Sequence, residues 1–185
     1  MDVKSVFIAI IIGVLSMTGL GVKLTSLIIS LSDNNIWPAL ILTGIACLLL
    51  GMEVPTTAAY VICVSVAGPA LVDMGLELLQ VHLFVFWFAL LSTITPPVCG
   101  TVFIASGMVS ENWLKVSLTS MSLGIGLYFI PLAMISNEAI IKLDTDFLSS
   151  MIAFVKIALS LVMLSFAFIS KNLIIVKMIA FVLGL

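Results

Sequence analysis

Charge is scarce in this 185-residue sequence, which contains no arginine, seven lysines and nine acidic residues. Only 9% of its residues are charged and 63% are hydrophobic, whereas a soluble domain carries about 25% charged and about 45–50% apolar residues. These proportions exclude a soluble globular protein. The net charge of −2, without a basic cluster, also excludes nucleic acid as a partner, because nucleic-acid binding needs concentrated lysine and arginine.

Residues that usually carry out catalysis are also few. With His82 as its single histidine, this chain cannot assemble a metal site of several histidines, and we expect no histidine-dependent catalytic triad in it. Three cysteines, Cys47, Cys63 and Cys99, stand singly in hydrophobic runs, so we interpret them as small buried side chains. No phosphate-binding loop, zinc-protease motif or nucleophile-elbow motif occurs. We therefore predict no enzymatic activity, no catalytic residues, no metal centre and no organic cofactor.

Long uncharged runs are what the sequence has instead. They cover 5–22, 34–52, 54–72, 78–110 and 116–137. Each is close to or above the roughly 20 residues with which a helix crosses a hydrocarbon core about 30 Å thick. The sequence therefore predicts an all-α, polytopic integral membrane protein.

Glycine, proline and polar residues divide these runs. The expected helices are 5–20, 24–31, 37–51, 56–67, 82–91, 98–109, 114–135 and 147–170, with a short segment over 172–185. Irregular or polar connections are expected over 32–35, 68–75, 111–113 and 138–146. At 114–135 we expect one uninterrupted span.

Two helix breaks fall next to hydrophobic segments. The first lies between Gly51 and Pro55, where a glycine ends one helix and a proline prevents its continuation. The second is the stretch Ser92-Thr93-Ile94-Thr95-Pro96-Pro97, near the middle of a 33-residue uncharged run. There we expect Thr95 to cap a new helix with Pro96 in its first turn. We therefore expect a helix interruption at each of these two breaks.

Broken helices at membrane depth need a reason, since each unpaired backbone group costs several kcal/mol in hydrocarbon. In transporters such breaks bind anions at helix N-termini and small cations at carbonyl and hydroxyl oxygens. The candidate ligands for ion or substrate are Thr56, Thr57, Ser92, Thr93, Thr95, Pro96 and Thr101. For the first break an ordinary surface loop remains the alternative. Glu53 is either a functional acid at membrane depth or a solvated interfacial residue.

The motifs around these breaks resemble a known family. They are Leu50-Gly51-Met52-Glu53-Val54-Pro55-Thr56-Thr57, then Gly68-Pro69-Ala70-Leu71-Val72, His82-Leu83-Phe84-Val85-Phe86 and Ile94-Thr95-Pro96-Pro97-Val98. In order and spacing they are similar to the large membrane subunit of tripartite ATP-independent periplasmic (TRAP) transporters, and most similar to permeases with fused subunits. The resemblance covers about residues 6–140.

The resemblance implies an elevator-type secondary transporter with helical hairpins, located in a prokaryotic inner membrane. It implies sodium-coupled uptake of organic acids such as C4-dicarboxylates, delivered by a periplasmic solute-binding protein. Residues 1–146 would be the C-terminal half of the large-permease transport domain, and 147–185 would add further membrane helices. The partners implied are the binding protein, the remaining permease half, a small membrane subunit and the lipid bilayer.

Departures from the family pattern leave alternatives to a complete transporter open. Val98 is followed by Cys99, where non-fused large subunits commonly have glycine, and about half of a large subunit is missing from the sequence. The alternative is therefore an inactive remnant, or an interaction fragment that pairs with a separately encoded N-terminal half. A channel-forming protein is a third, weaker option.

Overall fold

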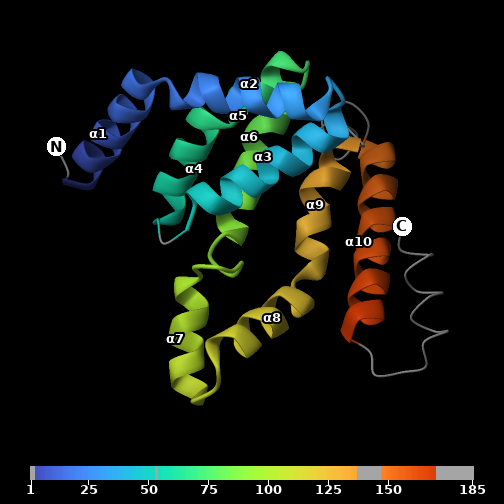
Figure 1. Ribbon diagram of the computed structural model, residues 1–185. Coiled ribbons are helices and arrows are strands. Elements are labelled where there is room, and N and C mark those ends of the chain that lie inside the picture. Colours follow the sequence, from blue (N-terminus) through green and yellow to red (C-terminus); the bar gives the residue numbers. More distant parts are fainter. Residues whose placement is uncertain (1–2, 53, 137–146, 170–185) are drawn as a thin grey trace. The chain divides into compact units, whose positions relative to one another are not determined.

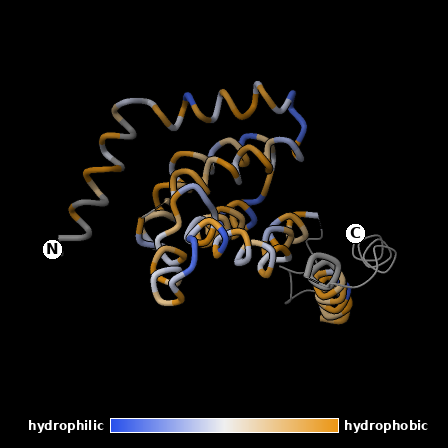
Figure 2. Tube along the Cα trace, turned by 60° about the horizontal axis from the view of Figure 1, so that its bottom comes forward, coloured by the Kyte–Doolittle hydropathy of each residue, from blue (hydrophilic) through white to orange (hydrophobic). Residues whose placement is uncertain are grey.

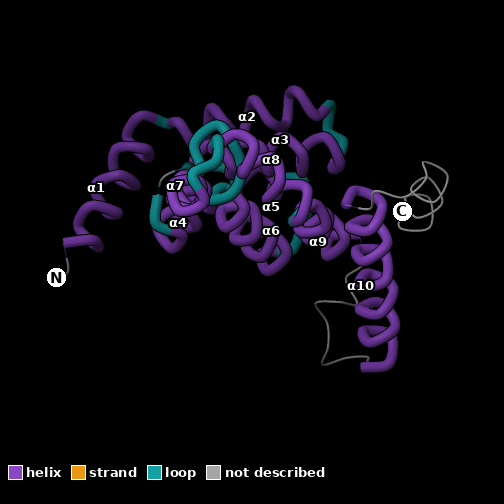
Figure 3. Tube along the Cα trace, turned by 90° about the horizontal axis from the view of Figure 1, so that it is seen from below, coloured by secondary structure: helices purple, strands orange, loops and turns teal. Residues whose placement is uncertain are grey.

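The structure is a computed structural model that describes residues 3–52, 54–136 and 147–169. Within these ranges the regular elements are helices and no strand occurs, as Figure 3 shows. The helices are α1 Val3–Thr18, α2 Leu20–Ser32, α3 Ile36–Leu50, α4 Thr56–Val66, α5 Gly68–Asp73, α6 Leu78–Leu91, α7 Gly100–Val109, α8 Trp113–Leu123, α9 Ile125–Ser136 and α10 Phe147–Ile169. The predicted all-α class is confirmed.

Two compact units make up the chain. Unit 1 comprises Met1–Thr93 and Pro97–Cys99, and unit 2 comprises Ile94–Pro96 and Gly100–Leu185. The division predicted from the sequence, into 1–146 and 147–185, concerns family coverage rather than packing and stays a prediction.

Unit 1 is built from α1 to α6. Helices α2, α3, α4, α5 and α6 pack against one another, and α1 contacts α2 and α4, as the upper part of Figure 1 shows. The core of this unit combines the phenylalanine Phe84, which is 1% exposed, with small and medium side chains that have no exposed surface, including Ala39, Leu40, Cys47 and Cys63. Small side chains let helix axes approach closely, which favours the short connections seen here.

Helices α1 and α2 of unit 1 are separated at Gly19. Its backbone has φ of +63°, a left-handed conformation that glycine adopts without strain. A polar turn follows α2 and is visible as a hydrophilic stretch in Figure 2. There Asn35 caps α3, because its side chain accepts a hydrogen bond from the backbone N–H of Trp37 at 3.2 Å. The predicted break and turn are both present.

Unit 2 is built from α7 to α10. Helix α7 packs on α8, where the Phe103 and Trp113 rings lie 4.9 Å apart between centroids, and α10 packs on α8 and α9. The prediction of one uninterrupted span over 114–135 is wrong: α8 and α9 meet at Gly124 with a bend of 43°. Ser120 and Ser122 in α8 donate to carbonyls four residues earlier, a pattern that often bends helices.

Two other predicted boundaries are wrong. Residues Gly68–Asp73 form helix α5 rather than an irregular stretch, since Pro69 lies in its first turn, where the missing N–H has no helical partner to lose. Helix α7 begins at Gly100, so neither Thr95 nor Pro96 lies in its first turn. Two consecutive prolines extend the break because each restricts the residue before it to extended backbone. The expected connection 138–146 and segment 172–185 lie outside the described residues.

In the described ranges no single helix is both long enough and apolar enough to cross a membrane, whereas the bent pair α8 and α9 jointly has the length and composition for a crossing.

Candidate functional site

The ends of two helices meet in unit 1. Helix α3 ends at Leu50 and is followed by Gly51, and α6 ends at Leu91 and is followed by Ser92. A Cβ atom placed on Gly51 would lie 2.5 Å from Ser92 Oγ and 3.0 Å from Ser92 Cβ. These distances are shorter than van der Waals contact, so the ends of α3 and α6 can lie this close only because residue 51 is a glycine. The first break predicted from the sequence therefore contacts the first residue of the second break.

Two hydroxyl groups form hydrogen bonds to backbone carbonyls at the C-terminal end of α6. Ser92 Oγ donates to the Ala89 carbonyl at 2.7 Å, and Thr93 Oγ1 donates to the Leu90 carbonyl at 2.8 Å. Ser92 is 1% exposed and Thr93 is half-buried. A hydroxyl that has donated its hydrogen retains oxygen lone pairs, which can accept a hydrogen bond or coordinate a cation. The end of α6 is therefore rich in oxygen ligands.

The N-terminal end of α4 lies five residues after Gly51 along the chain. Helix α4 begins at Thr56 after Pro55, and Thr56 and Thr57 are both exposed in its first turn. The first N–H groups of a helix have no carbonyl partner in that helix and carry partial positive charge. Glu53, the candidate functional acid, lies outside the described residues.

The remaining candidates belong to unit 2. Thr95 is 8% exposed, and its Oγ1 lies 2.6 Å from the hydroxyl oxygen of Tyr128 in α9. Pro96 is half-buried beside it in sequence, and Thr101 is exposed in the first turn of α7. The structure thus joins Ser92 to the first break in unit 1, and Thr95 to Tyr128 in unit 2.

Sequence reasoning missed Tyr128. It is one of only two tyrosines in the chain and stands inside the uncharged run 116–137. A tyrosine hydroxyl in an apolar region usually has a hydrogen-bond partner, so a tyrosine in such a run was a usable signal. The other tyrosine, Tyr60 of α4, likewise has a partner, since its hydroxyl lies 2.6 Å from His82 Nδ1 in α6.

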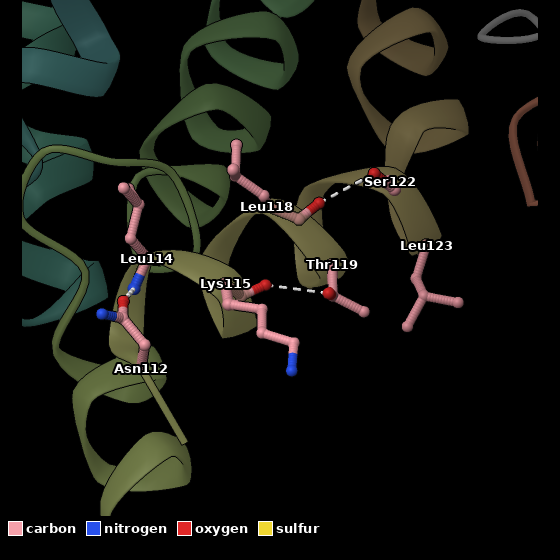
Figure 4. Close-up of a pocket in the computed structure, with 7 residues that line it drawn as sticks. All are labelled: Asn112, Leu114, Lys115, Leu118, Thr119, Ser122 and Leu123. Carbon is pink, nitrogen blue, oxygen red and sulfur yellow. Dashed lines mark hydrogen bonds between the residues drawn. The ribbon is translucent and has the colours of Figure 1, made fainter.

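Two hollows lie away from these residues. One, of about 650 Å³, runs along α8 and is shown in Figure 4. It is lined by Asn112, Leu114, Lys115, Leu118, Thr119, Ser122 and Leu123. Thr119 and Ser122 donate within α8 itself, both at 2.8 Å, and Lys115 pairs with Glu111 at 3.1 Å. One helix and its cap supply the whole lining, so the hollow is an open helix face.

The second hollow, of about 490 Å³, lies in unit 1 beside α2, α4 and α5. Its lining includes Thr25, Ser65 and Asp73. It contains none of the residues predicted as ligands. Among the described residues, no three His, Cys, Asp or Glu side chains gather as a transition-metal centre would require.

Comparison with known proteins gives the family. A family model described as the tripartite ATP-independent periplasmic transporter, DctM component, matches residues 6–147. No curated protein and no solved structure matched the chain. The matched region contains both helix breaks and helices α2 to α9 in full. The chain therefore belongs to the DctM family of tripartite ATP-independent periplasmic transporters, which are membrane permeases rather than enzymes.

Proposed function

We propose that this chain forms part of a secondary transporter that imports organic acids together with sodium ions. C4-dicarboxylates or similar carboxylates are the proposed substrates, and a prokaryotic inner membrane, crossed several times, is the proposed location. Membership of a permease family supports a transport role. The observation that carries the ion coupling is the contact between Gly51 and Ser92, which joins the two helix breaks.

The cation side of the proposal follows from the helix ends. The C-terminal ends of α3 and α6 each carry partial negative charge, and they meet at Gly51 and Ser92. Sodium resembles other hard cations in preferring oxygen ligands, and both hydroxyls and carbonyls are present there. Thr93 adds another hydroxyl to these helix ends in unit 1. Within unit 2, Thr95 is proposed as a separate oxygen ligand for a coupling cation.

The anion side of the proposal follows from the lack of arginine. Without a guanidinium group, this chain cannot hold a carboxylate in a bidentate pair. The N-terminal end of α4 offers backbone N–H groups and a positive dipole end, with Thr56 and Thr57 exposed there. We therefore assign the substrate carboxylate to this helix end.

The proposed transporter has several parts. Its family name describes a tripartite system, which supports a periplasmic solute-binding protein and a small membrane subunit as partners. Further helices of the permease, expected from the sequence, and the lipid bilayer complete the proposed assembly.

The test is uptake of radiolabelled succinate into proteoliposomes that contain this chain and its genomically neighbouring permease segments, with the binding protein added outside. An inward sodium gradient is compared with an equal potassium gradient. We expect uptake only with sodium and only with the binding protein.

Three results would overturn this function. Equal uptake in potassium would exclude sodium coupling. Ion conductance without substrate accumulation would favour a channel. Absence of uptake, although all components co-purify as one complex, would favour the interaction-fragment alternative.

A further inference from the structure

The second break is attached to α9 through one short hydrogen bond. Thr95 Oγ1 and the Tyr128 hydroxyl lie 2.6 Å apart, although the two residues are 33 positions apart in sequence. A Cβ atom placed on Gly124 would lie 3.6 Å from Ile94 Cδ1, so the neighbouring residue Ile94 lies beside the junction between α8 and α9. Residues 94–96 are therefore anchored at the bend between α8 and α9, within unit 2.

The backbone of Thr95 has little freedom of its own. Because Pro96 follows, steric conflict disfavours helical backbone at Thr95, and Pro97 restricts Pro96 in the same way. The side-chain torsion χ1 is the main remaining variable, and it decides where the Oγ1 lone pairs point. The hydrogen bond to Tyr128 fixes this torsion.

We propose that Tyr128 is a positioning residue that, within unit 2, orients the Thr95 hydroxyl as an oxygen ligand of a coupling cation. This inference rests on the proposed sodium-coupled function. Tyr128 acts through Thr95 and does not bind the cation itself. With the hydrogen bond in place, the Thr95 oxygen is held in one orientation before the cation arrives, so binding does not have to order it.

Tyr128→Phe tests the proposal, since it removes one oxygen atom and keeps the ring. Tyr60→Phe is the matched control, because Tyr60 also has a part-buried hydroxyl in a 2.6 Å hydrogen bond, in this case to His82. The readout is the sodium concentration that gives half-maximal succinate uptake, measured in the same proteoliposomes. We expect Tyr128→Phe to raise this concentration about three- to tenfold, the effect of losing one hydrogen bond.

Other quantities separate positioning from a general structural defect. The KM for succinate at saturating sodium should stay unchanged in Tyr128→Phe, and Tyr60→Phe should leave the half-maximal sodium concentration unchanged. Thr95→Ser keeps the hydroxyl and should retain most sodium affinity. Thr95→Val should weaken it, and adding Tyr128→Phe to Thr95→Val should produce no further loss, because both act through one oxygen.

A second measurement uses the purified chain without transport. Cys99 is fully buried at the end of the same loop, so its alkylation by a maleimide, followed by peptide mass spectrometry, reports opening of the loop. We expect sodium chloride, but not choline chloride, to slow the alkylation of Cys99. In Tyr128→Phe, a higher sodium concentration should be needed for the same protection. Sodium protection that is identical in wild type and Tyr128→Phe would overturn the positioning role. Absence of sodium protection in the wild type, together with sodium-independent uptake, would instead overturn the proposed function.

Discussion

The two helix breaks begin in the same way and continue differently. At the first, Gly51 ends α3 and α4 starts only five residues later, with exposed threonines in its first turn. At the second, Ser92 ends α6 and α7 starts only at Gly100. The hydroxyls of the second break form short hydrogen bonds of 2.6–2.8 Å to Ala89, Leu90 and Tyr128.

This difference separates two kinds of helix interruption. The first break places a helix N-terminus next to solvent-accessible space, which suits a ligand that arrives and leaves. The second break orders its hydroxyls against the protein, which suits an ion site that must keep its geometry. The predictions that follow are ordered by the size of the expected effect and test whether these two roles are distinct.

Gly51→Ala should have the largest effect on stability. Gly51 has φ of −84°, which alanine adopts freely, so the effect is steric alone. The added Cβ would overlap Ser92 Oγ, at 2.5 Å, and we expect a loss of about 1–3 kcal/mol. Thermal unfolding of the detergent-solubilised chain measures it.

The control for this substitution is Gly107→Ala, because no atom lies within 4 Å of the added Cβ. In the middle of α7 the change should be neutral or stabilising by up to about 1 kcal/mol. Adding Ser92→Gly to Gly51→Ala should restore part of the stability. If Gly51→Ala unfolds at the wild-type temperature, the two breaks are not in contact.

Ser92→Ala should have an intermediate effect. It removes the buried hydrogen bond to the Ala89 carbonyl and should cost about 1 kcal/mol. Ser30→Ala is the matched control, because Ser30 also donates to the carbonyl three residues earlier, at 3.0 Å, but is exposed. Equal losses in the two variants, measured by the same unfolding assay, would contradict a special role for the buried end of α6.

Thr57→Val should have the smallest effect on stability. Thr57 is exposed in the first turn of α4, so the expected change is within about 0.5 kcal/mol. Its effect should fall on transport instead, as a raised KM for succinate with an unchanged sodium requirement. A changed sodium requirement with normal KM would place the cation, and not the carboxylate, at this helix end.

Much of the architecture followed from local sequence patterns. The polar turn at 32–35 and the proline at 55 separate helices at the expected positions, whereas the break at Gly19 places the start of the next helix at Leu20 and not at the expected residue 24. The wrong boundaries also have local causes: Pro69 was compatible with the first turn of a helix, and Gly124 was underestimated as an interruption between α8 and α9. For the site, the sequence identified the hydroxyls of both breaks, and their roles as ligands stay predictions.

The sequence alone determined that this protein is helical, belongs to a permease family and has breaks near Pro55 and Pro96. These properties depend on composition, on hydrophobic length and on neighbours within a few residues. Tertiary structure decided that Gly51 contacts Ser92 and that Thr95 meets Tyr128. Such pairs are tens of residues apart, and the packing of whole helices, rather than any local pattern, brings their atoms within contact distance.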